Sequence, residues 1–287
     1  MKHRLTNKMI EDFQEYLQNE EKSAATIEKY IRDIRAFCAW IRGEEFGKML
    51  VLRYKEHLKE TYKTTSINSM LSSLNSFFDF LDWTDCKVKT IKVQKQIFYE
   101  ENKELTKAEY ERLLKTAQSR SNQRLYYIMQ TICSTGIRIS ELKYITVEAV
   151  RAGRAEVHSK GKYRTIILPK ALCSVLKRYI KNQYLKRGSI FVTKSGKTMN
   201  RTNIWAEMKR LCEEANVDEA KVFPHNLRHL FARTYYSLQK DIVRLADILG
   251  HSSVNTTRIY TIESGKVHRR QIQRLGLVYG AVKNMTS

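Results

Sequence analysis

Residues 134–142 read Ser-Thr-Gly-Ile-Arg-Ile-Ser-Glu-Leu, and this stretch ends one predicted helix and opens another. The helix expected near 122–134 should end at Gly136, because glycine readily adopts the left-handed conformation that closes a helix. Arg138 then begins a new helical turn, where a guanidinium beside unpaired backbone amides makes a good anion site. Glu141 follows one turn later and is placed to brace Arg138. The alternative is an ordinary salt bridge with a structural role only.

A second segment, residues 224–229, reads Pro-His-Asn-Leu-Arg-His. Proline is common at the start of a helix and residues three apart share a helical face, so His225 and Arg228 should project together. A histidine can move a proton near neutral pH, and an arginine can donate to two phosphate oxygens at once. His229 is expected to point elsewhere, either packed or exposed. On its own, this pair is a weak signal.

A third segment, residues 249–261, reads Leu-Gly-His-Ser-Ser-Val-Asn-Thr-Thr-Arg-Ile-Tyr-Thr. A helix over 241–249 should end at Gly250 and present His251 at a corner. A serine at 252 or 253 can cap the next short helix, and Tyr260 lies near its end. Considered alone, Tyr260 is better explained as one of 16 tyrosines, half-buried and without a chemical role.

A fourth segment is a predicted hairpin over 154–168, with its turn at Lys160 and Gly161. A lysine at the tip of a hairpin can reach into a groove. The alternative is a solvated turn, because lysine and glycine are common there. This segment is the least specific of the four.

The four segments together suggest one kind of chemistry. They contain arginines, histidines, a lysine and a tyrosine, but no pair of carboxylates suited to Mg²⁺. Such a set fits metal-free phosphoryl transfer. The arginines would neutralise charge on the phosphate oxygens, a tyrosine hydroxyl would attack phosphorus, and a lysine or histidine would protonate the leaving oxygen.

Apolar residues at helical spacing predict four helices in residues 1–85, near 7–18, 27–41, 48–60 and 67–81. Residues 86–102 break this pattern and read as an extended, basic, flexible linker. Beyond the linker, helices are expected near 106–118, 122–134, 170–187, 202–215, 225–238 and 241–249, with a short strand at 190–192. The predicted fold is therefore mainly α, with a small β-sheet in the C-terminal domain.

The charge of the chain is concentrated after the linker. The 287 residues include 52 Lys and Arg against 30 Asp and Glu, a net charge of +22. Residues 1–100 hold 17 basic and 15 acidic residues, whereas residues 101–287 hold 35 and 15. A domain this basic most often binds a polyanion, most commonly nucleic acid. Ribosome association and simple solubility are the alternatives.

Several other classes of protein are disfavoured. No apolar run approaches the ~18 residues of a membrane span, and the first residues lack the apolar stretch of a signal peptide. Five scattered cysteines without a C-x-x-C pattern argue against a disulfide framework and against a zinc site; they are Cys38, Cys86, Cys133, Cys173 and Cys212. We expect a cytoplasmic protein with no membrane contact.

The order of these segments resembles that of the tyrosine recombinase (phage integrase) family. The matching features are T-G-I-R-I-S-E-L, the lysine hairpin, H-N-L-R-H, and L-G-H with a tyrosine nine residues after the histidine. Residues 11–41 also resemble the core-binding domain of the family. The resemblance implies a helical-bundle core-binding domain over 1–85, the linker over 86–102, and a catalytic domain over 103–287 that ends in an oligomerisation segment.

The resemblance also implies roles for the charged residues. Arg138 and Arg228 would hold the scissile phosphate, with Glu141 supporting Arg138. Lys160 would be the acid for the 5′-oxygen leaving group. The hairpin is one residue shorter than the common family pattern, which leaves Lys162 as an alternative; Lys160 is favoured because it precedes the glycine.

The remaining roles fall on three residues. His225 would assist proton transfer, His251 would hydrogen-bond the phosphate, and Tyr260 would be the nucleophile that forms a 3′-phosphotyrosyl link. No metal and no cofactor are implied.

The expected activity is site-specific DNA recombination or integration through a four-way (Holliday) junction in a protein tetramer. The type would be a simple two-domain Xer-like or mobile-element integrase, associated with the bacterial nucleoid. Its partners would be double-stranded DNA with recombination sites, further copies of itself, and accessory DNA-bending or directionality proteins. The segment 262–287 would pack within its own chain or on a neighbouring protomer. The alternatives are strand relaxation of the type IB topoisomerase kind and a non-catalytic DNA-binding protein.

Overall fold

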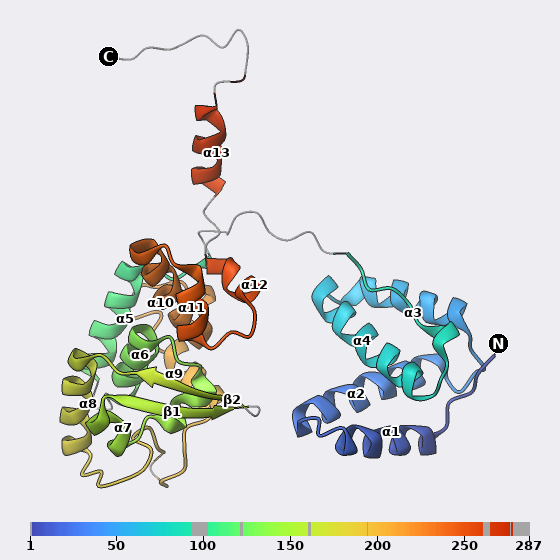
Figure 1. Cartoon of the computed structure of the whole chain (residues 1–287), viewed down its shortest axis with the longest axis horizontal. Coiled ribbons are helices and arrows are strands. Elements are labelled where there is room, and N and C mark those ends of the chain that lie inside the picture. Colours follow the sequence, from blue (N-terminus) through green and yellow to red (C-terminus); the bar gives the residue numbers. More distant parts are fainter. Residues whose placement is uncertain are drawn as a thin grey trace. The chain divides into compact units, whose positions relative to one another are not determined.

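A computed structural model describes residues 2–92, 103–120, 123–159, 162–193, 195–260, 265–275 and 277. The chain divides into two compact units, Met1–Lys95 and Gln96–Ser287 (Figure 1). Each unit has its own buried apolar core. The prediction of a mainly α protein with a small sheet is confirmed. No helix in these ranges combines the length and apolarity that crossing a bilayer requires.

The N-terminal unit contains the four predicted helices. They are α1 (Asn7–Asn19), α2 (Ala24–Ile41), α3 (Lys48–Thr61) and α4 (Thr64–Phe80). The Ser23 hydroxyl caps α2 by accepting from the Thr26 amide. Apolar residues at helical spacing place Phe13, Phe37 and Phe77 in the core without exposed surface.

The first part of the predicted linker is held against α4. After the short helix η1 (Thr84–Cys86), residues 87–92 contain no helix or strand. The Asn75 side chain exchanges two hydrogen bonds with the Val88 backbone, at 2.9 and 3.1 Å. Asn68 does the same with Ile91, at 2.8 and 2.7 Å. These paired bonds fix residues 88–91 on α4, so flexibility was the wrong expectation for this half. Residues 93–102 lie outside the described ranges.

The C-terminal unit is built around α6 (Arg124–Thr135), the central green helix in Figure 1. It packs against α5 (Lys107–Ser119), α8 (Lys170–Asn182), α9 (Arg201–Lys209) and α10 (Pro224–Gln239). Residues on several faces of α6 are buried, including Tyr127, Ile128 and Met129, as expected for a helix surrounded by others. A capping box between Thr106 and Glu109 begins α5.

The predicted hairpin is the sheet of this unit. Strands β1 (Arg154–Ser159) and β2 (Lys162–Ile167) pair antiparallel from Arg154 opposite Ile167 to Ser159 opposite Lys162. The remaining elements are η3 (Ile139–Tyr144), α7 (Val147–Ala152), η4 (Glu219–Lys221), α11 (Ile242–Leu249), α12 (Val254–Thr257), η5 (Arg258–Tyr260) and α13 (Gly265–Arg274).

Three element predictions were wrong. Residues 190–192 form no strand; isolated bridges join Ser189 to Thr146 and Val192 to Thr198, because neither neighbour continues as a strand. Helix α8 ends at Asn182 rather than near 187, since Tyr184 adopts a left-handed conformation two residues later. Helix α9 ends at Lys209 rather than near 215, and residues 210–216 form turns.

Candidate active site

Gly136 ends α6 and brings Arg138 to the surface of the core. Its φ of +64° is the left-handed conformation that the sequence predicted for this position. A Cβ here would lie 2.5 Å from a ring carbon of Phe231 on α10, so the close approach of these helices also requires glycine. Arg138 follows as the cap of η3 and thereby begins the predicted helical turn.

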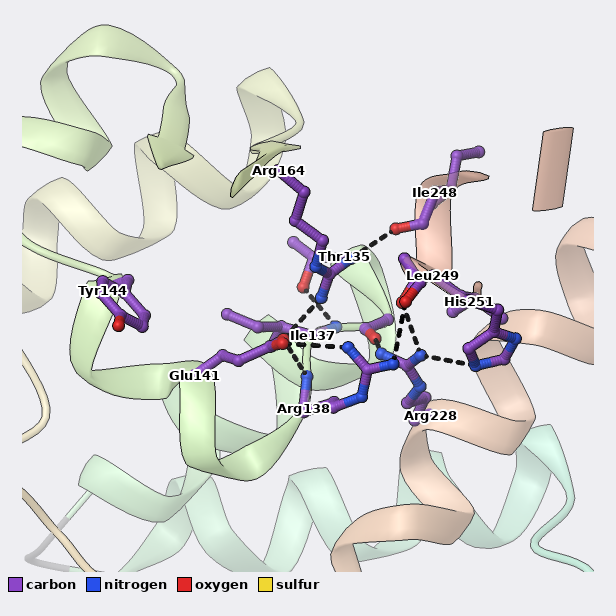
Figure 2. Close-up of polar contacts among 12 residues, drawn as sticks. Thr135, Ile137, Arg138, Glu141, Tyr144, Arg164, Arg228, Ile248, Leu249 and His251 are labelled. Atoms are coloured by element: carbon purple, nitrogen blue, oxygen red, sulfur yellow. Dashed lines mark hydrogen bonds and ion pairs between the residues drawn. The ribbon is translucent and has the colours of Figure 1, made fainter. Parts of the chain in front are cut away.

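Glu141 joins two arginines from different elements. Its carboxylate accepts from the Arg138 backbone amide and from Nη1, each at 3.0 Å, and from Arg164 Nη2 on β2 at 2.5 Å. Figure 2 shows both arginines pointing toward Glu141. Burial acts to raise the pKa of Glu141, but the Arg138 amide and the charge of Arg164 hold it below its usual range. The predicted brace is therefore present, and Arg164 is an additional member that the sequence analysis did not single out.

Arg228 is the most buried arginine of the site, with 2% of its surface exposed. Its guanidinium donates to the carbonyl oxygens of Gly136 and of Leu249, the latter at 2.8 Å, and contacts His251 Nε2 at 3.0 Å (Figure 2). Burial, followed by the charge of Arg138, lowers the pKa of Arg228 to about 10. Arg228 thus ties the loop after α6 to the corner after α11.

His251 stands at the corner that Gly250 makes after α11. Gly250 has a φ of +63°, and its carbonyl accepts from Arg138 Nη2 at 3.1 Å. Besides Arg228, His251 contacts the buried Thr257 hydroxyl through Nδ1 at 2.8 Å. Burial and the nearby arginine charges lower the pKa of His251 to about 4, so the imidazole is neutral at pH 7.

Tyr260 lies in η5 with 4% of its surface exposed. Its ring is stacked on that of His251, with centroids 6.2 Å apart, and perpendicular to that of His229 at 5.0 Å. Burial raises the pKa of Tyr260, and a hydrogen bond and the charge of Arg228 oppose this effect. The phenol therefore carries its proton at neutral pH.

His225 and His229 lie one turn apart on α10, with ring centroids separated by 4.4 Å. Desolvation, followed by the charges of His229 and Arg228, lowers the pKa of His225 to about 4. The expectation that His229 points away from the site was wrong. A spacing of four residues keeps it on nearly the same face as His225, where it contacts Tyr260 and lies 3.4 Å from Glu104 Oε1.

A cleft of about 750 Å³ opens beside these residues. Arg138, His225 and Arg228 form one part of its wall, and Arg201, Trp205 and Lys209 on α9 contribute to another. The positively charged wall suits an anionic ligand.

The structure does not decide which lysine of the hairpin would be the acid. Strands β1 and β2 flank the turn as expected, but Lys160 and Gly161 lie outside the described residues. Lys162 is placed through its backbone, opposite Ser159. The choice of Lys160 over Lys162 stays a prediction.

A tyrosine beside two arginines and two neutral histidines can attack a phosphodiester whose charge the guanidinium groups balance. Together with the mainly helical fold, this site defines the class of DNA strand-transferring enzymes that use a tyrosine. The phage integrase family model matches residues 103–265, and a phage integrase N-terminal SAM-like domain matches residues 10–85. The chain therefore belongs to the phage integrase family and is a tyrosine recombinase.

Individual relatives agree with this assignment. The tyrosine recombinase XerA of Thermococcus kodakarensis is 30% identical over 266 residues, which cover 89% of this chain and 90% of that protein. The crystal structure of XerA recombinase, at 26% identity, matches with a TM-score of 0.52 over 96% of this chain and 100% of that one. The XerH recombinase in a post-cleavage complex with palindromic difH substrate has a TM-score of 0.71 over 96% of this chain and 85% of that one; at 18% identity this likeness concerns the fold.

Proposed function

We propose that this recombinase cuts and rejoins specific DNA sites through a covalent bond between Tyr260 and a 3′ phosphate. The observation that carries the proposal is the junction at Arg228. This one guanidinium contacts the loop after α6, the corner after α11 and His251. Its charge and a hydrogen bond from it also act to lower the pKa of the Tyr260 hydroxyl. Three segments that are distant in sequence thus meet at one anion-binding point.

Arg138 and Arg228 would hold the non-bridging oxygens of the scissile phosphate. The Arg138 side chain is 40% exposed toward the cleft, so an incoming phosphate can reach it, while Glu141 fixes its position. His251 would hold Arg228 in place for the same phosphate, because its Nε2 accepts from that guanidinium instead of donating to the phosphate. Fixed positive groups of this kind stabilise the charge that develops during in-line attack.

The phosphotyrosyl link would store the energy of the broken bond. One phosphate ester is exchanged for another, so rejoining needs no ATP, and a phenol with a reference pKa near 10 leaves more easily than an alcohol. Lys160 would protonate the 5′-oxygen, and His225 would assist proton transfer. No metal or cofactor takes part in this scheme.

The substrate would be double-stranded DNA bearing two recombination sites. The helical N-terminal unit would bind the duplex as a core-binding domain and, with the catalytic unit, close around it as a clamp. The freed 5′-hydroxyl of a partner duplex would attack the link, and two such exchanges would pass through a four-way junction in a tetramer. We place the protein in the cytoplasm, at the nucleoid, with accessory DNA-bending proteins as further partners.

The C-terminal segment would pack on a neighbouring protomer in that tetramer. The described part of this segment supports the idea, because Ile272 and Leu275 expose 66% and 63% of their surfaces. Apolar side chains exposed near the end of a helix are suited to an intermolecular contact.

The test is formation of a covalent adduct on a nicked duplex from the DNA that flanks the gene. Wild type should give a protein–DNA adduct that survives denaturant, whereas Tyr260→Phe should give none and keep its DNA affinity. Tyr184→Phe is the matched control, because Tyr184 is 90% exposed and lies just after α8. Adducts with Tyr260→Phe would disprove the nucleophile.

Two further readouts separate the alternatives. A type IB topoisomerase activity would relax a supercoiled plasmid that lacks any recombination site, and a non-catalytic protein would bind DNA without forming an adduct. We expect neither result. DNA affinity should also fall steeply with salt, because a basic surface releases counterions when it binds a duplex.

A further inference from the structure

Glu104 and His229 form a carboxylate–imidazole pair beside the tyrosine. Glu104 lies just before α5, and its Oε1 is 3.4 Å from Nδ1 of His229 on α10. Arg233 Nη2 lies 3.2 Å from the other carboxylate oxygen. The two partners of the pair are 17% and 18% exposed. Because a carboxylate accepts, Nδ1 of His229 donates, and Nε2 therefore has a free lone pair when the ring is neutral.

The free nitrogen of His229 is buried, and its ring packs against the ring of the nucleophile. Nε2 is inaccessible to solvent and has no hydrogen-bond partner among the residues that the structure describes. A buried acceptor without a partner is uncommon in folded proteins and calls for an explanation. The His229 ring meets the Tyr260 ring at 85° with centroids 5.0 Å apart, closer than the 6.2 Å between His251 and Tyr260. The unused acceptor therefore belongs to a ring that packs on the residue that must lose a proton.

The other two histidines of the site have lowered pKa values. Both ring nitrogens of His251 are engaged, by Arg228 and Thr257, and its pKa is lowered to about 4. The pKa of His225 is also lowered to about 4. By contrast, hydrogen bonding to His229 and the charge of Arg233 outweigh burial and lower the pKa of Glu104, so this carboxylate is ionised. An ionised carboxylate at Nδ1 orients an imidazole and stabilises the imidazolium that forms when Nε2 takes a proton.

We propose that His229 accepts the phenolic proton of Tyr260 during cleavage and that Glu104 is its positioning residue. The inference rests on the proposed function and adds a catalytic group to it. The proton passes from Tyr260 Oη to His229 Nε2 as the Oη–P bond forms and the P–O5′ bond breaks. The leaving oxygen takes its proton from the separate acid, assigned above to Lys160. In rejoining, the attacking 5′-hydroxyl gives its proton to that same acid as the O5′–P bond forms, the Oη–P bond breaks, and His229 returns its proton to the phenolate.

The first test separates the nucleophile from the leaving group. A substrate with sulfur in place of the bridging 5′-oxygen releases a thiolate, which leaves without protonation because thiols are far more acidic than alcohols. His229→Phe keeps a ring against Tyr260 but removes the nitrogens, and it should slow cleavage of the oxygen substrate roughly a hundredfold. We expect sulfur to restore cleavage by Lys160→Ala but not by His229→Phe. Restoration of His229→Phe by sulfur would overturn the proposal.

The second test changes the acidity of the nucleophile. Replacing Tyr260 with 3,5-difluorotyrosine gives a phenol that needs less help to lose its proton, so it should restore most of the rate lost in His229→Phe. A purely structural role for His229 predicts no such restoration, and that result would contradict our assignment. Glu104→Gln should show the same pattern with a smaller loss, about tenfold, because the amide oxygen can still accept from Nδ1.

Control variants keep these outcomes interpretable. Glu214→Gln removes an exposed carboxylate that pairs with Arg120 on the same unit, and it should cleave both substrates at the wild-type rate. Thermal unfolding and DNA affinity show whether each variant folds. Cleavage by both His229→Phe and Glu104→Gln within about threefold of wild type would exclude the proposed role. Adducts with Tyr260→Phe would instead overturn the proposed function itself.

Discussion

Thr257 and His251 are joined by a hydrogen bond of 2.8 Å between Oγ1 and Nδ1, and Thr257 is completely buried. Arg228 donates to the other ring nitrogen, so that nitrogen must be the acceptor in neutral His251. Nδ1 therefore carries the proton and donates a hydrogen bond to the Thr257 hydroxyl. Since Thr257 precedes Tyr260 by three residues, one short helical segment carries both the nucleophile and the group that orients its neighbouring histidine.

Thr257→Val should disturb this arrangement while preserving the shape of the side chain. The Nδ1–H of His251 would lose its acceptor, so we expect the free energy of unfolding to fall by about 1–2 kcal/mol. Adduct formation should slow about tenfold because the ring is no longer held. Denaturant unfolding and adduct kinetics measure the two effects. Thr256→Val, at the exposed neighbour, is the control; equal rates in the two variants would argue against the orienting role.

Arg228 and Arg138 should respond differently to replacement by lysine. Buried Arg228 contacts two carbonyl oxygens and His251, whereas the Arg138 side chain is 40% exposed. A lysine cannot reproduce the planar set of donors, so both variants should lose cleavage by roughly a hundredfold. Only Arg228→Lys should also lose stability, on the order of 2–3 kcal/mol, because it leaves buried acceptors unpaired. Equal stability of the two variants by denaturant unfolding would contradict this reading.

Gly250 is required for two reasons that a matched pair of variants can separate. Both Gly250 and Gly153 have left-handed φ angles, of +63° and +72°. A Cβ on Gly250 would lie 2.5 Å from Arg164 Cδ, whereas one on Gly153 would meet nothing within 4 Å. Gly153→Ala should therefore cost only the conformational penalty of about 1 kcal/mol.

Gly250→Ala should cost more, because Arg164 must shift away from its bonds to Glu141 and to the Ile248 carbonyl. We expect adduct formation to slow about tenfold in this variant alone. Thermal unfolding and adduct yield, measured side by side, provide the comparison. If both alanine variants show the same thermal unfolding and the same adduct yield, the contact between residue 250 and Arg164 does not matter for cleavage.

Features that depend on short-range geometry could be predicted from the sequence. The left-handed end of α6 at Gly136, the helical turn that begins at Arg138 and the brace from Glu141 all lie within six residues. Helical spacing likewise located α2 and α4, since a helix that buries one face needs apolar residues every three or four positions.

Features that depend on tertiary packing could not be predicted from the sequence. Arg164 reaches Glu141 only because the hairpin folds beside η3, and nothing in a Lys-Gly turn indicates that partner. Similarly, the carboxylate beside His229 comes from Glu104, 125 residues earlier. A four-residue spacing did contain the information that His225 and His229 share a face of α10, and this signal could have kept His229 among the candidates.

The histidines of the site also make the stability of the protein depend on pH. The pKa values of His225 and His251 are lowered to about 4 from 6.5. Below pH 6.5 these two histidines bind protons in the unfolded chain but stay neutral in the folded chain until the pH approaches 4. Their contribution to the free energy of unfolding is therefore fully present above pH 6.5 and is lost as the pH falls toward 4. Burial is the largest cause of both shifts. The neighbouring groups that also disfavour a further positive charge are Arg138, Arg164, Arg201, Arg228, His225 and His229, whereas Glu104 acts in the opposite sense.

The midpoint of thermal unfolding should therefore decrease as the pH is lowered from about 7.5 to 4.5. In a variant carrying both His225→Asn and His251→Asn, the decrease should be shallower, because asparagine does not titrate. His57→Asn is the control, since His57 lies on α3 in the other unit and is 47% exposed; it should keep the wild-type slope. If the double variant also keeps that slope, the histidines of the site do not govern the pH dependence, and burial and the neighbouring charges do not hold these imidazoles neutral.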